Sequence, residues 1–207
     1  MLKGRWEVLS ADIKNVINEA GFRTFLQALL DHDTNEYKDL QLLLAFSERL
    51  SDTTCTFHFP SIGEVMLTPY DFSAITSLKL GDERIKVNDS ITLVEIRGLL
   101  GAMPPKIRSK NVPLMWLYSN IGNCKTIATD TRMFMLLFIG TLLRPNLGST
   151  VSLCYLWSLR DMRDIGKIKN YDWGGMAYAT FLHFITQLSR HRLSSLGGAP
   201  FVWQVRF

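Results

Sequence analysis

The stretch MFMLLFIGTLL, residues 133–143, contains only apolar residues apart from Gly140 and Thr141. An apolar run of this length, without alternating polar residues, is typical of a helix that is buried on most of its sides. Asp130 precedes the run at a distance that suits a helix cap, and Pro145, which follows it, cannot continue a helix. The sequence therefore predicts a buried helix over 133–143 that is capped by Asp130.

Two further helices are expected after this one. The segment 153–165 has leucines and a tryptophan on one side and charged residues on the other, which predicts an amphipathic helix. Residues 172–189, beginning with Asp172 as the cap, predict a longer helix with an apolar stripe, and the basic residues 190–192 stand at its negative end. His183 falls within this apolar helix, and we interpret it as a core histidine rather than a base.

Shorter helices are expected in the N-terminal half. Ser10 can cap a helix whose apolar residues recur at helical spacing, and Gly21 can end that helix in a left-handed conformation. Apolar residues cover much of the segment 37–50, which predicts a largely buried helix. A modest helix is expected over 91–100.

Residues 54–68 differ from the helical segments around them. β-branched and aromatic residues flank the turn-forming residues 60–63, which predicts a short β-hairpin. Directly after it, Thr68 is placed to cap a helix, Pro69 suits the first helical position, and Asp71 faces the positive end of the helix dipole. We therefore expect a short helix to begin at this point.

These elements predict a mainly α fold: a single α-helical domain with a short β-hairpin near residues 54–68. No alternation of strands and helices supports a parallel sheet. The domain is expected to span residues 1–207, and a boundary between two lobes, if there is one, is expected in the connector near 101–112.

The composition, with 47% hydrophobic and 20% charged residues, is that of an ordered globular protein. Cys55, Cys124 and Cys154 are widely spaced and odd in number, which predicts reduced thiols in an intracellular compartment. No apolar signal-peptide segment is found, and the longest uncharged run, 173–189, is too short and too polar for a membrane span. Because glycine-rich phosphate loops and paired zinc-ligand motifs are lacking, no cofactor or metal is expected.

Charge is divided unevenly between the two halves of the chain. Residues 1–103 contain 10 Lys and Arg and 15 Asp and Glu, giving 10 − 15 = −5, and residues 104–207 contain 13 and 4, giving 13 − 4 = +9. A basic half favours nucleic acid or an acidic partner if its charges gather on one face. The alternative is an ordinary solvated surface, because the basic residues are spread over several segments.

Catalysis has little support in the residue pattern. An enzyme site could combine His58, Glu64 and Asp71 with a distant partner, because acid and base groups need only reach the same substrate. The alternative is that both carboxylates satisfy backbone groups of the hairpin and the helix start, and that strand alternation points His58 to solvent, away from Phe57 and Phe59. We favour the structural interpretation and expect no enzyme activity.

Several segments, taken in order, resemble the plant mobile domain, also called the aminotransferase-like plant mobile domain. The clearest is GEVMLTPYDF, residues 63–72, which is similar to the family's G-E-x-x-x-T-x-x-D segment. Further similar segments lie at 20–22, 43–49, 54–60, 132–134, 156–166 and 171–174. The residues that carry the structural motif by this resemblance are Gly21, Phe22, Glu48, Arg49, Phe57, His58, Pro60, Gly63, Glu64, Thr68, Asp71, Arg160, Asp161, Gly166, Trp173 and Gly174.

The sequence departs from the family pattern at three places. Leu50 stands where the family usually has tryptophan, and residues 77–80 replace a turn of the Gly-Leu-Pro type. The usual domain continues well past the position of 197–198, whereas this sequence ends at Phe207. A C-terminally truncated copy of the domain is therefore expected.

The resemblance implies a transposon-related, non-catalytic module of plant nuclear proteins. It implies roles in transposon and gene silencing, genome stability and meristem maintenance, and association with a serine/threonine phosphatase of the phosphoprotein phosphatase type. It brings no catalytic residues, and no lysine for pyridoxal phosphate can be placed in this sequence. The leading hypothesis is protein-protein interaction, and the alternative is direct DNA binding through the basic C-terminal half by a module derived from a transposable element.

Overall fold

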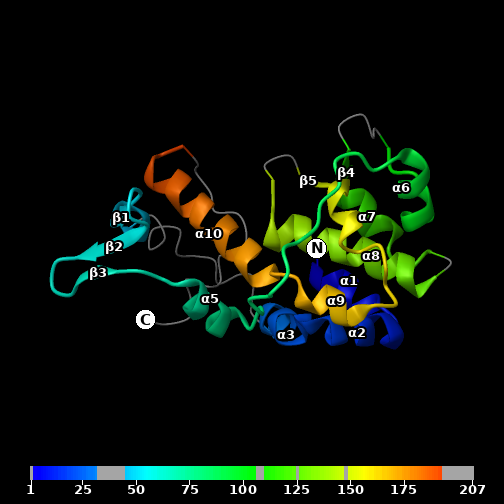
Figure 1. The fold of residues 1–207 in the computed structure, drawn as a ribbon, viewed down its shortest axis with the longest axis horizontal. Coiled ribbons are helices and arrows are strands. Elements are labelled where there is room, and N and C mark those ends of the chain that lie inside the picture. Colours follow the sequence, from blue (N-terminus) through cyan, green and yellow to red (C-terminus); the bar gives the residue numbers. More distant parts are fainter. Residues whose placement is uncertain (1, 32–44, 106–109, 125, 147–148, 193–207) are drawn as a thin grey trace.

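The chain is mainly α-helical, as predicted, with about 58% of its residues in helices and 10% in strands. The structure, a computed structural model, describes residues 2–31, 45–105, 110–124, 126–146 and 149–192. The predicted helix over 37–50 lies partly outside these ranges, and its described residues 45–48 are helical. Figure 1 shows a compact group of helices at one end of the long axis and a small sheet at the other.

The predicted central helix is α8 (Ile127–Phe138), which continues as a wider π-helical turn, η4 (Ile139–Leu143). Residues 133–138 are all buried. Two helices pack against α8: α6 (Leu93–Leu100) and α7 (Leu114–Asn120). These contacts explain why this stretch is apolar around its whole circumference.

The predicted cap of this helix was wrong. Thr126 caps α8, because its hydroxyl accepts the backbone N–H of Thr129, and the helix therefore begins one turn earlier than expected. Asp130 is buried inside the helix, where its carboxylate accepts the backbone N–H of Gly122 at 2.6 Å. This carboxylate thus fixes the turn between α7 and α8 rather than the start of α8.

The N-terminal segment forms helices α1 (Leu2–Val8), α2 (Ala11–Ile17) and α3 (Arg23–Asp31). Ser10 caps α2 as predicted, and Gly21 has the predicted positive φ of 93°. The chain does not end its helix at Gly21, however. It passes through a kinked π-helical turn, η1 (Asn18–Phe22), and continues directly as α3, because glycine accommodates the left-handed kink at no steric cost.

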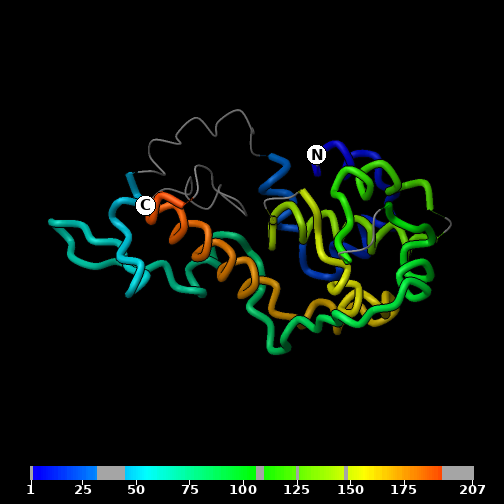
Figure 2. The backbone as a smooth tube through the Cα atoms, turned by 90° about the horizontal axis from the view of Figure 1, so that it is seen from above, coloured from blue at the N-terminus to red at the C-terminus, as the bar shows by residue number. Residues whose placement is uncertain are grey.

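A three-stranded antiparallel sheet, which we call the arm, projects at the end of the molecule away from α8 (Figures 1 and 2). It consists of β1 (Leu50–Ser51), β2 (Thr56–Phe59) and β3 (Gly63–Val65) in the order β1-β2-β3. Phe57 lies opposite both Leu50 and Val65. The region therefore holds one more strand than the expected hairpin. A second sheet, formed by β4 (Asn111–Pro113) and β5 (Thr150–Ser152), was not expected.

The helix predicted over 153–165 was also wrong. The chain forms a short 3-10 helix, η5 (Leu153–Trp157), then turns, and then forms α9 (Ile165–Asn170), which is capped by Asp164. Three leucines spaced three residues apart, Leu153, Leu156 and Leu159, are fully buried. Leu153 and Leu156 lie in the 3-10 helix, where a spacing of three places side chains on one line, and Leu159 lies in the turn that follows.

The longest α-helix among the described residues, α10 (Trp173–Ser189), is capped by Asp172 as predicted and connects the helical body to the arm (Figures 1 and 2). It packs on α5 (Pro69–Thr76) and on η4. At its C-terminal end Arg190 forms an ion pair of 2.6 Å with Asp52 of the arm. The hydrogen bond and charge of Arg190 lower the pKa of Asp52.

Candidate functional site

The sixteen residues that carry the family resemblance fall into three places in the fold. The first is the core between η1 and the start of α10. Phe22 and Trp173 are buried there, with ring centres 5.7 Å apart. Gly174 lies against a backbone segment, since its N–H donates to the carbonyl of Lys79 at 3.0 Å. Gly166, near the start of α9, lies on the surface. The buried members of this group hold the body of the domain together.

The second place is the arm and the helix that follows it, which contain nine of the sixteen residues. Phe57 is buried, and its ring packs edge-to-face on Phe46 with ring centres 6.2 Å apart. His58 and Glu64 are cross-strand neighbours on the opposite, solvent-exposed face. The hydroxyl of Thr56 donates to the carboxylate of Glu64 at 3.1 Å. The remaining members are Glu48 and Arg49 before β1, Pro60 in the turn, Gly63 in β3, and Thr68 and Asp71 at the start of α5.

Thr68 and Asp71 form a reciprocal capping box, as the sequence predicted for the helix start. The Thr68 hydroxyl accepts the N–H of Asp71 at 3.2 Å, and the Asp71 carboxylate accepts the N–H of Thr68 at 2.9 Å. The hydrogen bonds from the hydroxyl and backbone of Thr68 lower the pKa of Asp71. Both side chains are thus used to begin α5, where Pro69 is the first residue.

The three groups considered for catalysis occupy different structural settings. His58 is exposed, as strand alternation predicted, and faces Glu64 across β2 and β3. Asp71, in contrast, belongs to the capping box of α5. Two of the three are therefore cross-strand neighbours, while the third has a separate role at a helix end.

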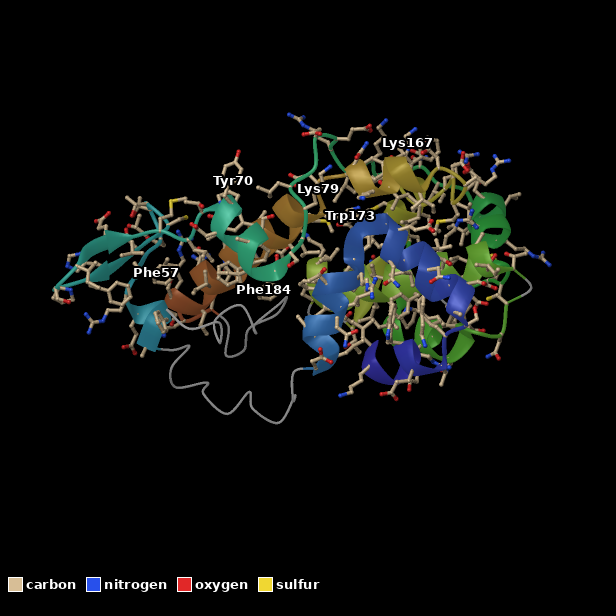
Figure 3. The ribbon with its side chains drawn as sticks, turned by 90° about the horizontal axis from the view of Figure 1, so that it is seen from below. Phe57, Tyr70, Lys79, Lys167, Trp173 and Phe184 are labelled. Carbon is tan, nitrogen blue, oxygen red and sulfur yellow. The ribbon has the colours of Figure 1, made fainter. Side chains whose placement is uncertain are left out.

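The arm and the following helix α5 carry large, exposed apolar side chains. Ile62 at the turn is 75% exposed, Tyr70 on α5 is 79% exposed, and Met66 between them is also exposed. Tyr70 points away from the body of the molecule, whereas Phe57 lies within the arm (Figure 3). We call Ile62, Met66 and Tyr70, together with the exposed pair His58 and Glu64, the arm surface. The arm surface combines apolar side chains with an exposed imidazole and an exposed carboxylate.

The third place is the turn between η5 and α9, which holds Arg160 and Asp161. The guanidinium of Arg160 lies over the indole of Trp157, 4.9 Å from the ring centre, and 3.5 Å from the carboxylate of Glu95. Asp161 accepts from Arg163 at 3.2 Å. These residues border a cavity of about 310 Å³ whose lining also includes Lys86, Asp164 and Lys167. The described lining thus has three cationic side chains, and two anionic side chains offset most of their charge.

The comparisons with known proteins identify the family. Residues 6–204 match the family described as "Domain of unknown function (DUF8566)". The chain belongs to the DUF8566 family. No curated protein and no solved structure matches the chain. The match covers the arm and all sixteen residues named above, so these features lie within the DUF8566 domain.

The described basic residues in the C-terminal half of this DUF8566 domain have different surroundings. Arg132 points inward, and its guanidinium donates to the carbonyls of Leu159, Leu99 and Arg160 at 2.8 to 3.3 Å. Arg163 and Arg190 form ion pairs with Asp161 and Asp52. Lys167 points outward from α9 (Figure 3). Several charges of the +9 half are therefore used within the fold.

The cysteines and acidic residues of the DUF8566 domain show no assembled reactive centre in the described ranges. Burial, with the charge of Asp130 nearby, raises the pKa of Cys124 to about 12, which keeps this thiol protonated. Burial also raises the pKa of Cys154. Within residues 2–31, 45–105, 110–124, 126–146 and 149–192, no group of three or more His, Cys, Asp or Glu side chains could hold a metal ion. The described helices also include none long and apolar enough to cross a membrane.

Sequence reasoning missed one feature of the DUF8566 domain. His183 was predicted to lie in the core, but it is exposed on α10 and borders a cavity. The helix is apolar because its other sides are buried, so the overall hydrophobicity of 173–189 concealed one open edge. The sequence contained one signal for this exposure. Gln187 lies four residues after His183, and two polar residues at this spacing share one face of a helix.

Proposed function

We propose that this domain is a non-catalytic interaction module of the plant mobile domain type, and that it binds a protein partner through the arm surface. The proposal treats residues 1–207 as a single, mainly α domain in which a hairpin-based arm serves recognition. A boundary between two lobes near 101–112 stays a prediction. The setting that the resemblance implies is a nuclear complex for transposon and gene silencing in plants.

The observation that supports this function is the exposure of large apolar side chains on the projecting arm and on α5, which follows it. Ile62 and Tyr70 are each more than 70% exposed, a state that is favourable for binding because their burial by a partner removes apolar surface from water. At the base of the arm, the hydroxyl of Tyr178 on α10 donates to the carbonyl of Leu67 at 2.7 Å. The arm is thus presented to a partner by a fixed support.

The polar residues of the arm support a role other than catalysis. The carboxylate of Glu64 accepts from Thr56, and that of Asp71 satisfies the first turn of α5. Both carboxylates therefore have structural partners that account for their positions. A binding role for the exposed face is compatible with these partners.

Direct DNA binding by a transposon-derived module is the alternative, and the charge of +9 in residues 104–207 favours it. Phosphate contacts release counterions, so such binding must weaken steeply between low and moderate salt. A gel-shift titration with duplex DNA at 50 and 200 mM salt decides this point. No binding, or binding that salt does not weaken, would remove the alternative.

The proposed function is tested by affinity capture from plant nuclei with quantitative mass spectrometry. The baits are the unchanged chain, an arm double variant (Ile62→Asp with Tyr70→Asp), and a control double variant on α6 (Leu93→Asp with Val94→Asp). Leu93 and Val94 are also exposed, so the control adds equal charge to equally apolar surface elsewhere. We expect proteins, including a phosphatase of the phosphoprotein phosphatase type or chromatin-associated proteins, that are retained by the control and lost by the arm variant.

A capture in which no such partner exceeds the bait-free background would count heavily against the proposal. Retention of the same partners by all three baits would move the binding surface away from the arm. Circular dichroism of each bait confirms beforehand that the substitutions leave the fold intact.

A further inference from the structure

A cavity of about 620 Å³ lies between α10 and residues 144–146, which follow η4, and it shares no residue with the arm surface. Its described lining comes from three parts of the chain: residues 144–146, Ser152 and Tyr155 in β5 and η5, and one face of α10 with Arg192 beyond it. Cavities that hold small molecules typically measure about 300 to 1,000 Å³. The size therefore suits an organic molecule rather than a single small ion.

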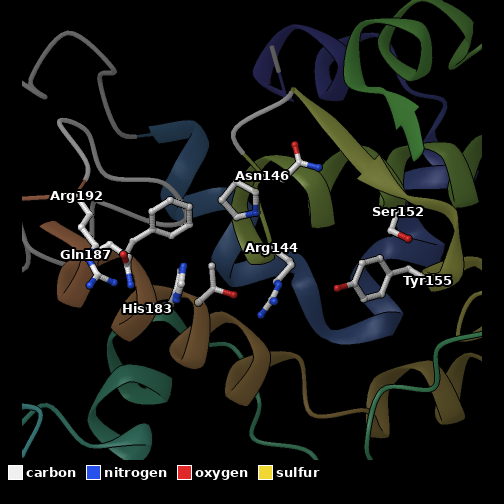
Figure 4. Close-up of a pocket in the computed structure, with 10 residues that line it drawn as sticks. Arg144, Asn146, Ser152, Tyr155, His183, Gln187 and Arg192 are labelled. Carbon is white, nitrogen blue, oxygen red and sulfur yellow. The ribbon is translucent and has the colours of Figure 1, made fainter. Parts of the chain in front are cut away.

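The cavity is lined by cationic and hydrogen-bonding side chains. Figure 4 shows Arg144 and His183 near its centre, on facing elements, with Tyr155 at one end and Arg192 and Gln187 at the other. Two guanidiniums and one imidazole thus face the space, and its described lining residues include no Asp or Glu. In the cavity beside Arg160, by contrast, two carboxylates offset the charge of the cations.

Arg144 and Arg192 form no salt bridge with a carboxylate among the described residues. Within the described part of the chain, salt bridges are formed by Arg160, Arg163 and Arg190, and Arg132 is bonded to three carbonyls. Neither Arg144 nor Arg192 takes part in such a pair. Two unpaired guanidiniums at one cavity leave their donors free for an anion, and guanidinium matches the geometry of phosphate oxygens.

Backbone hydrogen bonds hold both arginines at helix ends. Arg144 follows η4, and its N–H donates to the carbonyl of Ile139 at 2.7 Å. Arg192 follows the end of α10, and its N–H donates to the carbonyl of Gln187 at 2.9 Å.

The walls between the charged groups are partly apolar. Pro145 and Phe184 line the cavity, and the imidazole of His183 packs edge-to-face on the ring of Phe184 with ring centres 5.8 Å apart. Tyr155 is half-buried, and burial raises the pKa of its hydroxyl, which keeps that hydroxyl a hydrogen-bond donor at neutral pH. A planar ring could lie on these walls while an anionic group contacts Arg144.

We propose that this cavity binds a small phosphate monoester with a planar ring, of the size of a mononucleotide. Arg144 and His183 bind the phosphoryl group, Arg192 adds to the positive potential, and Pro145 and Phe184 contact the ring. The free energy of binding comes from charge-assisted hydrogen bonds together with the burial of the ring. No covalent change of the ligand is part of the proposal.

The test measures binding of adenosine 5′-monophosphate, adenosine and inorganic phosphate to the full chain at low salt by isothermal titration calorimetry. Arg144→Gln removes the central cation, and Arg163→Gln makes the same chemical change at an exposed arginine outside the cavity. We expect adenosine 5′-monophosphate to bind and adenosine to fail. Arg144→Gln should weaken binding at least tenfold, which corresponds to about 1.4 kcal/mol, and Arg163→Gln should leave it within twofold.

Inorganic phosphate should compete with the nucleotide but bind more weakly, because it lacks the ring. Equal affinity for phosphate and nucleotide would overturn the assignment of the apolar walls to a ring. The whole proposal fails if the unchanged chain binds neither adenosine 5′-monophosphate nor inorganic phosphate at millimolar concentration. It also fails if the Arg144→Gln variant binds the nucleotide as tightly as the unchanged chain does. Thermal unfolding of both variants verifies that each is folded when it is titrated.

Discussion

The rings of Phe22 and Trp173 meet edge-to-face in the core, with their centres 5.7 Å apart and their planes at 65°. Phe22 is the last residue of the kinked turn η1, and Trp173 is the first residue of α10. The contact therefore joins an N-terminal segment of the chain to its C-terminal helix. Phe138 of α8 completes the cluster, 5.1 Å from Phe22. The body that supports the arm therefore depends on this contact.

Replacing Trp173 by phenylalanine tests the polar part of this arrangement. The indole N–H donates to the carbonyl of Ile168 at 2.7 Å in a buried setting. Phenylalanine keeps an aromatic ring but leaves that carbonyl without its donor, which costs about 1 to 3 kcal/mol. Urea unfolding of Trp173→Phe should show a loss of this size, followed by circular dichroism because the substitution removes a fluorophore. A change below about 0.5 kcal/mol, the range of neutral surface substitutions, would show that the hydrogen bond contributes nothing.

Gly174 and Gly98 are both helical glycines, and replacing each by alanine is expected to change the stability of the fold in opposite directions. A Cβ at Gly174 would lie 2.8 Å from the carbonyl oxygens of Leu78 and Lys79, whereas a Cβ at Gly98 would meet nothing within 4 Å. Gly174→Ala should destabilise the fold by about 1 to 3 kcal/mol through overpacking. Gly98→Ala should stabilise it by about 1 kcal/mol through helix propensity. Thermal and urea unfolding measure both, and equal signs would contradict the close approach.

The capping box of α5 gives a prediction for Thr68. Thr68→Ala removes the hydroxyl that accepts the N–H of Asp71 and should cost about 1 kcal/mol, whereas Thr68→Ser keeps the hydroxyl and should cost much less. The free energy of unfolding in urea at pH 7 measures both variants. An equal loss for alanine and serine would assign the effect to the lost methyl group instead.

The carboxylate of the same box predicts a pH dependence. Because the pKa of Asp71 is lower in the folded state than its ordinary value of 3.8, its ionised form stabilises the fold. This contribution is fully present above about pH 5 and is lost as the pH falls through the lowered folded-state pKa. Asp71→Asn should therefore be less stable than the unchanged chain at pH 7, and the two should converge as the pH falls toward 2. A constant difference across this range would rule out a role for the charge.

Arg132 should be a structural arginine of the core. Its guanidinium bonds to the carbonyls of Leu99, Leu159 and Arg160, and so connects α6 to the segment after η5. Arg132→Met keeps most of the side-chain volume but leaves these carbonyls unpaired, and a loss of about 3 kcal/mol is expected. Arg163→Met, on the surface, should change stability by less than about 0.5 kcal/mol. Similar losses for the two variants would contradict the special position of Arg132.

The sequence predicted local features that depend on a few neighbouring residues. The caps at Ser10, Thr68 and Asp172, the left-handed Gly21 and the apolar 133–143 helix all follow from short-range chemistry, and each of them is confirmed. Features that depend on distant contacts were missed. Asp130 resembles a helix cap in the sequence, but its carboxylate accepts a hydrogen bond from the N–H of Gly122 across a turn. The residues around Asp130 do not predict this bond.

The candidate binding regions show the same division. The alternation that pointed His58 to solvent is a local rule, and it was correct. The cavity beside Arg144 joins residues from η4, η5 and α10, so no single segment could have predicted it. His183 was misassigned for this reason: its exposure at the cavity depends on contacts between distant segments and not on the apolar pattern of α10. The family resemblance likewise identified residues but could not specify their contacts.

The central claim, that the arm surface binds a protein partner, is tested most directly by the dissociation constant of a purified partner obtained by nuclear capture. Calorimetry or biolayer interferometry with the unchanged chain, the Ile62→Asp and Tyr70→Asp double variant, and the Leu93→Asp and Val94→Asp control supplies this value. We predict that the arm variant binds at least tenfold more weakly, equivalent to about 1.4 kcal/mol, and that the control binds within twofold of the unchanged chain. Equal affinity of the arm variant and the unchanged chain would contradict the proposed function.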